Sequence, residues 1–210
     1  MIAMAAFMAV YLAVSLLLMW PRVDAVAAAS LAVSVLLGAE HLSFARRLPS
    51  DDARQEAFGM RYDPGMAKWI AGLSIAELAV FLDFGHLRLV PALEWMPLRW
   101  LGLGLYAAAL AWLWWADLYL ARHFAAGGER EVIARGPFRF VRHPRYVGLI
   151  ASRAAFALAF GSVLGYAFVP VWVAIVLRRI RLEEAHLVGL FGDRYRAYAD
   201  ATARLLPGVY

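Results

Sequence analysis

The chain has 210 residues, of which 63 % are apolar, and it carries a formal charge of +5 with a mean hydropathy of +0.63. A soluble domain of this length could bury a core but would not need this much apolar sequence, so the composition favours a polytopic membrane protein. The lack of Cys excludes disulfides and thiolate chemistry, and the scatter of Arg among apolar segments argues against a nucleic-acid partner.

Apolar segments of about 20 residues, the length that crosses a bilayer as a helix, recur from the N-terminus onward. Residues 2–20 lack the basic start of a signal peptide, and we interpret them as a retained first span. Residues 25–44 form the second predicted span and residues 66–90 the third. The fourth, residues 98–121, ends in a cluster of Trp and Tyr that suits the level of the lipid headgroups.

Residues 146–177 are too long for one ordinary span, and Gly161 and Ser162 offer a turn in the middle. We therefore predict a hairpin of two short spans, followed from Arg178 by an amphipathic cytoplasmic helix. The sequence thus predicts an all-α membrane bundle of about six transmembrane helices in a single domain, residues 1–210. Its two parts are the N-terminal spans, residues 1–121, and the connector, hairpin and tail, residues 122–210.

Lys and Arg are distributed unevenly between the polar segments. Residues 45–68, 122–145 and 178–210 hold five, six and six of them, whereas the opposite loops hold only Arg22, Arg88 and Arg99. Because positively charged loops stay in the cytoplasm, both termini and the polar site are expected there, which requires an even number of spans. The high content of Ala, Leu and Arg is typical of a GC-rich genome, so we expect a bacterial inner-membrane protein.

The block before the hairpin reads Arg-Gly-Pro-Phe-Arg-Phe-Val-Arg-His-Pro-Arg-Tyr-Val-Gly and ends at Gly148. Pro144 disfavours helix at His143 and suits a first turn, so a helix is expected to begin at or after Pro144. Arg142 and His143 then lie at a helix N-terminus, where a carboxylate or phosphate binds well. Tyr146 adds a ring and a hydroxyl, and Gly148 permits close approach of a ligand or another helix. A basic turn that only anchors the topology is the alternative.

Glu183 and Glu184 come after the predicted hairpin. Adjacent side chains on a helix point about 100° apart, so the two carboxylates are expected to serve different partners. One would face the bundle and accept hydrogen bonds from ribose hydroxyls or an ammonium group, and the other would hold an Arg. Ordinary surface pairs with Arg179 and Arg181, at helical spacing, are the alternative.

Glu77 and Arg153 are charged residues within predicted spans. Polar groups at membrane depth are costly and are kept mainly where they bind or react with something. Arg153 lies within two turns of Tyr146, so we expect it to line an acceptor site, and a buried pair with Glu77 is the alternative. The five His residues show no metal-binding spacing, so no metal site is expected.

Four blocks in the C-terminal half, taken in order, resemble the isoprenylcysteine carboxyl methyltransferase (ICMT) family and the related membrane phospholipid methyltransferases. They are residues 136–148, 181–184, 191–198 and 204–207. Phe138 stands where the family often has Tyr. The first 120 residues are similar to the family only in being apolar spans.

The resemblance implies an integral membrane methyltransferase that uses S-adenosyl-L-methionine. Carried onto this chain, it implies cofactor binding by Arg142, His143, Tyr146, Gly148, Glu183 and Glu184. The methyl group would go to a lipophilic membrane acceptor, and isoprenylcysteine-like carboxylates, phospholipid amines, lipid phenols and small thiols all stay open. A carboxylate acceptor needs no base, and no residue stands out as one.

Two other functions are weighed against methyl transfer. The ending Leu-Leu-Pro-Gly-Val-Tyr also resembles membrane sterol reductases, which use a reduced nicotinamide cofactor. A non-enzymatic transporter or scaffold would use the basic loops to bind anionic lipid headgroups. The intact Arg-His-Pro block and Glu pair favour methyl transfer.

Overall fold

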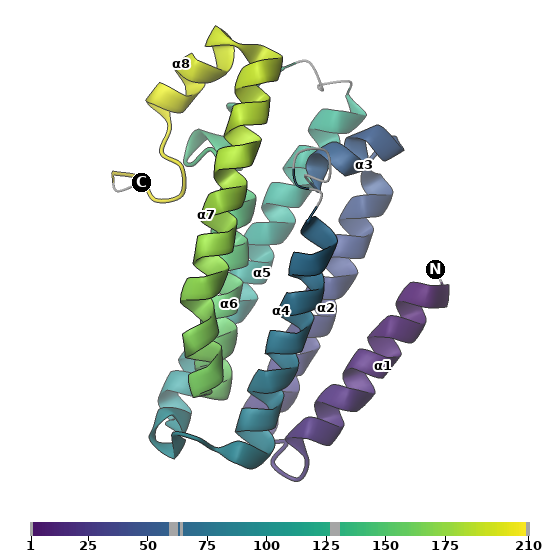
Figure 1. The fold of residues 1–210 in the computed structure, drawn as a ribbon, viewed down its shortest axis with the longest axis vertical. Coiled ribbons are helices and arrows are strands. Elements are labelled where there is room, and N and C mark those ends of the chain that lie inside the picture. The colour runs from purple at the N-terminus through teal and green to yellow at the C-terminus, as the bar shows by residue number, and fades with distance from the viewer. Residues whose placement is uncertain (1, 59–62, 64, 127–130, 209–210) are drawn as a thin grey trace.

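The computed structural model describes residues 2–58, 63, 65–126 and 131–208, and these are helical with no β-strand among them. The α-helices are α1 (Ile2–Met19), α2 (Ala25–Arg47), α3 (Asp51–Ala57), α4 (Met66–Leu82), α5 (Met96–Ala125), α6 (Pro144–Phe160), α7 (Val163–Phe191) and α8 (Asp193–Ala201). Short helical turns of π or 3-10 type are η1 (Asp83–Leu87), η2 (Pro91–Glu94) and η4 (Gly136–Arg139). The long helices run roughly side by side, whereas α3 and α8 lie at one end of the bundle (top of Figure 1).

The predicted all-helical class is confirmed. The membrane assignment is confirmed as well, but not the predicted number of spans. Within the described residues, α2, α5 and α7 are long and apolar enough to cross a bilayer. Helix α1 contributes a shorter apolar stretch, Ala9–Met19, and α4 and α6 have 17 residues each. Three helices therefore meet the criterion of length and composition, and the count of six spans stays a prediction.

Helices α5 and α6 form the closest pair in the bundle. At Gly102 the backbones approach so closely that a Cβ would lie 2.4 Å from the Ala159 nitrogen. Small residues permit this kind of packing between membrane helices. Edge-to-face and tilted contacts among Phe81, Phe156 and Phe160 fill the space beside this contact, with ring centroids 4.8–5.5 Å apart.

The predicted hairpin is present, although its second arm is much longer than expected. Gly161 ends α6 in the left-handed conformation (φ 61°), and a Cβ there would lie 2.5 Å from the Leu93 carbonyl oxygen. Ser162 caps α7 and donates a hydrogen bond to Asp83 (2.6 Å). Helix α7 has 29 residues and carries the polar segment that we expected to form a separate tail helix. It continues because no left-handed residue interrupts it before Gly192 (φ 57°).

The polar segment after α2, for which no helix was predicted, contains the short helix α3. Ser50 caps α3 by accepting a hydrogen bond from the Ala53 N–H, and Asp51 lies in the first turn. A Ser cap followed by acidic residues is the usual signal of a helix start. Helix α3 forms part of the lining of the candidate site described below.

Ion pairs close the end of the bundle opposite α3 and α8. The Arg99 guanidinium, 2 % exposed, makes two hydrogen bonds of 2.6 and 2.9 Å to Asp24, which also caps α2. Arg22 pairs with Glu94 at 2.5 Å. Burial alone would raise the pKa of the Glu94 carboxyl, but hydrogen bonds from Arg22 and Arg88 hold it below its usual value.

Replacing Asp24 by Ala is expected to destabilise the protein in detergent by about 3 kcal/mol, because Arg99 would be left buried without its counter-ion. Thermal unfolding followed by circular dichroism measures this change. Asp51→Ala is the matched control, since the Asp51 carboxylate is 87 % exposed and its pair with Arg54 contributes little. Equal melting temperatures for the two variants would contradict the prediction.

Candidate functional site

The Arg-His-Pro block lies where α6 begins, as predicted. His143 has a non-helical backbone (φ −125°, ψ 61°), and Pro144 is the first residue of the helix. The Trp112 indole donates a hydrogen bond of 2.7 Å to the Pro144 carbonyl and ties this start to α5. The first-turn N–H groups of α6, which include those of Arg145 and Tyr146, have no acceptor within a helix and can receive an anion.

Glu184 joins three segments that are far apart in the sequence. Its carboxylate lies 2.7 Å from Nε of Arg142, 3.2 Å from Nε2 of His143 and 2.8 Å from Nη2 of Arg204. These groups come from the residues before α6, from α7 and from the tail. We call Arg142, Glu184 and Arg204 the tail clamp, because they hold the tail against the start of α6.

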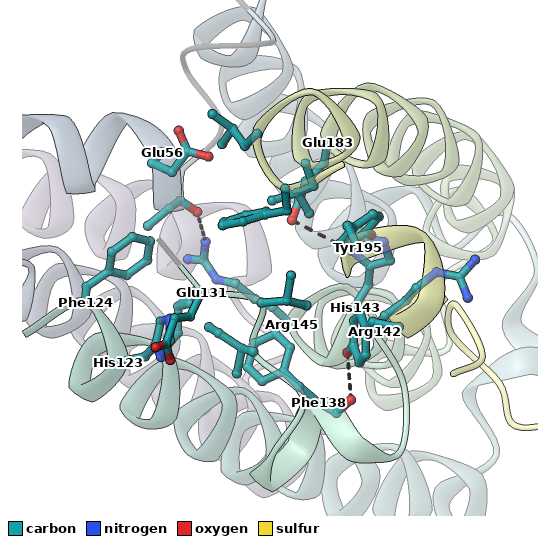
Figure 2. Close-up of a pocket in the computed structure, with 18 of the residues that line it drawn as sticks. Glu56, His123, Phe124, Glu131, Phe138, Arg142, His143, Arg145, Glu183 and Tyr195 are labelled. Carbon is teal, nitrogen blue, oxygen red and sulfur yellow. Dashed lines mark hydrogen bonds and ion pairs between the residues drawn. The ribbon is translucent and has the colours of Figure 1, made fainter. Parts of the chain in front are cut away.

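The backbone around Arg142 completes this attachment. Its N–H donates to the Ala203 carbonyl at 2.8 Å, and its guanidinium donates to the carbonyls of Ala199 and Thr202. Figure 2 shows the Arg142 guanidinium turned away from the middle of the cavity described below. The side chain predicted to bind a ligand carboxylate is therefore engaged with the tail, and direct contact with a cofactor stays a prediction.

Glu183 has a main partner of its own, Tyr146, and shares only His143 with Glu184, which agrees with the angle between adjacent helical residues. The Tyr146 hydroxyl donates to its carboxylate at 2.6 Å, and Nδ1 of His143 lies 3.8 Å away. Arg179 donates to the Tyr146 oxygen and to the Phe58 carbonyl. Glu183 thus faces the interior at the end of the bundle, while Glu184 holds two Arg side chains.

A cavity of about 300 Å³ opens between these elements, and we call it the connector cavity. Its size is at the lower end for small-molecule sites. Arg142, His143, Tyr146 and Glu183 line it, whereas Glu184 lies behind it. Other lining side chains give it a mixed polar and apolar surface (Figure 2): Glu56, Glu131, Phe138, Leu187, Leu190, Tyr195 and Tyr198.

Gly148 lies elsewhere, against α5. A Cβ at this position would come within 2.5 Å of Leu113 and 3.1 Å of Trp112. Of the two roles considered for Gly148, close approach of a helix is the one that the geometry fits, and Gly148 is absent from the lining of the connector cavity.

Tyr195 on α8 is the feature of the connector cavity that points most directly to a ligand. Its side chain is 3 % exposed and its hydroxyl has no hydrogen-bond partner among the described residues. Burial, followed by the nearby charges of Glu184 and Glu183, raises the pKa of this phenol, so it stays protonated. Tyr198, one turn away, donates instead to the Phe138 carbonyl at 2.7 Å. A buried hydroxyl without a partner is costly unless a ligand or water meets it.

This set of groups fits S-adenosylmethionine, the cofactor that the sequence resemblance implies. The cofactor has a carboxylate, which suits the first-turn N–H groups of α6, and an ammonium and hydroxyls, which suit Glu183 and Glu131. Tyr195 offers an unused donor or acceptor, and Phe138 and Leu187 offer apolar surface. No cluster of three or more His, Asp or Glu side chains in the described part of the chain is arranged to hold a metal ion.

A second cavity, of about 430 Å³, lies inside the bundle between α1, α2, α4, α5, α6 and α7, and we call it the bundle cavity. Its walls are mostly apolar, with Leu73 and Trp172 among them. Arg145 and Tyr146 line both cavities. These two side chains therefore form a common wall between a polar site at the end of the bundle and an apolar site within it.

Arg153 lines the bundle cavity and is absent from the lining of the connector cavity. It forms an ion pair with Glu77, whose other carboxylate oxygen accepts a hydrogen bond of 3.0 Å from the Tyr11 hydroxyl. Both roles considered for Arg153 are thus compatible with the structure, because the buried pair itself faces the cavity.

Arg145 was not singled out by the sequence, although it stands inside the Arg-His-Pro block. It pairs with buried Asp117 at 2.8 Å, donates to the Ala57 carbonyl at 3.0 Å, and stacks over the rings of Phe44 and Phe58. The sequence signal for this pair was an Arg and an Asp on two consecutive apolar helices. Arg204 and Tyr195 lie within the matching blocks, but their roles depend on contacts that only the folded chain shows.

Comparisons with known proteins bear on the same segment. Residues 96–194 match the model of the phospholipid methyltransferase family. The chain is 38 % identical over 71 residues to methanethiol S-methyltransferase 1 of Bradyrhizobium diazoefficiens, and these residues cover 33 % of this chain and 24 % of that protein. It is 28 % identical over 152 residues to methanethiol S-methyltransferase of Mycobacterium tuberculosis, and these residues cover 63 % of this chain and 61 % of that protein.

A third relative, methanethiol S-methyltransferase of Pseudomonas deceptionensis, is 31 % identical over 127 residues, which cover 53 % of this chain and 44 % of that protein. The chain thus spans less than two thirds of the length of each of these relatives. No solved structure matches it. The match over residues 96–194 includes all of α5, α6 and α7 and the Arg-His-Pro block. This segment is similar to the phospholipid methyltransferase family, which confirms the resemblance inferred from the C-terminal blocks.

Proposed function

We propose that the protein is an integral membrane methyltransferase that transfers a methyl group from S-adenosylmethionine to an uncharged lipophilic acceptor. The observation that carries the proposal is the common wall of Arg145 and Tyr146 between the connector cavity and the bundle cavity. A polar donor in the first cavity and an apolar acceptor in the second would meet there. Holding two reactants in register is the largest contribution that a protein can make to a direct displacement.

When bound, S-adenosylmethionine supplies a methyl group on a cationic sulfonium. Glu183 would accept hydrogen bonds from its ammonium or hydroxyls, and the first turn of α6 would receive its carboxylate. Tyr195 would use its unpaired hydroxyl, and His143 lines the same wall as Tyr146. These residues bind and orient, and none of them is required to move a proton.

The tail clamp would close the connector cavity from the aqueous side. Arg142 and Arg204 bring the tail to Glu184, and the tail carries Tyr195 over the cavity. Covering the site in this way excludes water from the reacting groups and strengthens their electrostatic contacts. Glu184 is therefore proposed as a positioning residue, which refines its expected role as a direct cofactor ligand.

The charges of the bundle cavity support an uncharged acceptor. The two acidic side chains that line it are already paired: Glu77 pairs with Arg153, and Asp63 with Arg178, which lies outside the lining. A carboxylate or ammonium acceptor would need an unused counter-ion, since burying an unpaired charge is costly. Among the acceptors left open by the sequence, a thiol or phenol fits these walls better than a carboxylate or an amine. The names of the three relatives support a small thiol.

The proposed topology places the connector cavity at the cytoplasmic face of a bacterial inner membrane. The polar segments at the end with α3 and α8 contain most of the Lys and Arg, and the opposite end contains Arg22, Arg88 and Arg99. With α1, α2, α4, α5, α6 and α7 all crossing, both termini lie on the cytoplasmic side. Accessibility labelling of single Cys residues introduced into the Cys-free chain tests this arrangement.

Calorimetric titration of the purified protein in detergent with S-adenosylhomocysteine tests the cofactor class. Binding is expected, and it should weaken in Glu183→Gln. Transfer of labelled methyl from S-adenosylmethionine to ethanethiol then tests the reaction. Binding of a reduced nicotinamide in place of S-adenosylhomocysteine would support a reductase, and binding of neither would favour a non-enzymatic lipid-binding or transport protein.

Tyr195→Phe is expected to lower the affinity for S-adenosylhomocysteine about fivefold, the effect of losing one hydrogen bond of about 1 kcal/mol. The same change should leave the thermal stability of the free protein unchanged or slightly higher, because the hydroxyl has no partner to lose among the described residues. Tyr198→Phe is the matched control, since it removes the hydrogen bond to Phe138 and should lower stability. An affinity unchanged by Tyr195→Phe would exclude the hydroxyl from the cofactor site.

A further inference from the structure

The bundle cavity contains a histidine that the cofactor site does not use. His41 on α2 lines this cavity, and its side chain is 32 % exposed. Nδ1 of the ring lies 2.8 Å from the Leu37 carbonyl, one turn earlier in the same helix. A carbonyl oxygen only accepts, so Nδ1 carries the proton and Nε2 of the neutral ring keeps its lone pair. Because Nδ1 is held against α2, the edge of the ring that carries Nε2 points away from that helix.

The depth of His41 places it near the common wall. It lies six residues before the end of α2, or about 9 Å along the helix at 1.5 Å per residue, on the side of the bundle where α6 begins (Figure 1). Phe44, one turn further, is in contact with the Arg145 guanidinium, 4.6 Å from the ring centroid. Arg153 is nine residues into α6 and therefore lies deeper. His41 thus lies closer to the proposed methyl donor than Arg153 does.

Other candidate bases in the bundle cavity are already engaged. Glu77 is held by Arg153 and Tyr11. Asp63 is 3 % exposed, with hydrogen bonds of 3.2 Å from Arg178 and from the Gly65 N–H. A carboxylate in such pairs is a poor proton acceptor, because protonation would break them.

Glu40 is the acidic side chain next to the His41 ring. Its carboxylate lies 3.6 Å from Nδ1 of His41 and its side chain is 5 % exposed. It is buried beside Asp117, which pairs with Arg145. Ionisable groups at membrane depth are kept mainly for binding and proton transfer. His41, Glu40, Asp117 and Arg145 thus form a chain of polar groups that leads from the bundle cavity to the common wall.

We propose that His41 is the general base of the reaction and removes the proton of a thiol acceptor in the bundle cavity. The inference rests on the proposed function. The thiol S–H bond breaks and its proton goes to Nε2 of His41. The electron pair of the thiol sulfur forms the new bond to the methyl carbon. The bond between that carbon and the sulfonium breaks, and its pair returns to the donor sulfur. The products are a thioether, S-adenosylhomocysteine and a protonated His41 facing the Glu40 carboxylate.

The test compares two thiols of different acidity in His41→Asn. The Asn amide can keep the hydrogen bond to the Leu37 carbonyl but has no basic nitrogen. Turnover of ethanethiol should fall by about 100-fold or more, within the range for loss of a general base, whereas the more acidic thiophenol should lose less than about tenfold. Affinity for S-adenosylhomocysteine should stay unchanged, because His41 is absent from the lining of the connector cavity.

His86→Asn is the matched control, since His86 is exposed in η1 at the opposite end of the bundle. Equal losses for the two thiols, or no loss, would overturn the role of His41 while leaving methyl transfer intact. If His41→Asn fails to bind S-adenosylhomocysteine, His41→Gln provides the same comparison, with an amide near the place of Nε2. A wild-type protein that binds no S-adenosylhomocysteine, or methylates no acceptor, would overturn the proposed function itself.

Discussion

Glu184→Gln is expected to weaken binding of S-adenosylhomocysteine by about 100-fold. The substitution leaves Arg142 and Arg204 without the carboxylate that joins them, and breaking a buried charged contact costs about 3–5 kcal/mol. A loss of about 2.7 kcal/mol in cofactor binding corresponds to 100-fold in affinity. The effect is indirect, because Glu184 lies behind the connector cavity and acts by holding the tail that carries Tyr195.

Two measurements separate this role from direct cofactor contact. Calorimetry gives the affinity, and limited trypsin digestion without ligand reports whether the tail has become accessible at Arg194 and Arg196. The variant should be cut faster than the wild type. Asp193→Asn removes the same charge from a carboxylate that is 94 % exposed, and it should change neither readout. Weakened binding with unchanged digestion would show that Glu184 contacts the cofactor itself and that the tail clamp does not depend on it.

Features set by local chemistry were predicted correctly from the sequence. The start of α6 follows from Pro144, whose ring suits a first helical turn and disfavours helix at the preceding residue. The turn between α6 and α7 follows from Gly161, which takes a left-handed conformation against the Leu93 carbonyl. The different main partners of the two carboxylates, Tyr146 for Glu183 and Arg142 for Glu184, follow from the geometry of adjacent positions on any helix.

Features set by long-range contacts were not predictable in the same way. The sequence gives no local sign that Arg204 returns to Glu184, or that Arg145 reaches Asp117 on a helix before the connector. The role of Gly148 was open for the same reason, because only packing against Leu113 distinguishes a helix contact from a ligand contact. Contacts of this kind decide which residues of a matching block face a cavity and which hold its walls in place.

The division between the two cavities also explains why the acceptor was the weakest part of the sequence prediction. The groups proposed to bind the cofactor lie in the C-terminal blocks and can be recognised as a pattern. More than half of the residues that line the bundle cavity lie before residue 96, outside the segment that matches the family. Tyr11, His41 and Glu77 belong to apolar helices in which no motif marks them. The pair of Glu77 with Arg153 was considered from the sequence, but the position of both side chains on the wall of this cavity becomes visible only when the helices are assembled.

Glu77→Leu is expected to destabilise the protein by about 3–5 kcal/mol, because Arg153 would remain in the bundle without its counter-ion. The double variant Glu77→Leu/Arg153→Met should regain most of that stability, since a buried ion pair replaced by apolar residues of similar volume is often neutral or stabilising. Thermal unfolding in detergent measures the three proteins side by side.

Activity of the double variant separates a structural pair from a functional one. If the pair orients the acceptor at the deep end of the bundle cavity, methyl transfer should fall at least about tenfold. The affinity for S-adenosylhomocysteine should stay unchanged, because both residues are absent from the lining of the connector cavity. Full activity in the restored double variant would show that the pair only stabilises the bundle. A loss of cofactor affinity would move Arg153 to the cofactor side of the common wall, contrary to the placement of both cavities.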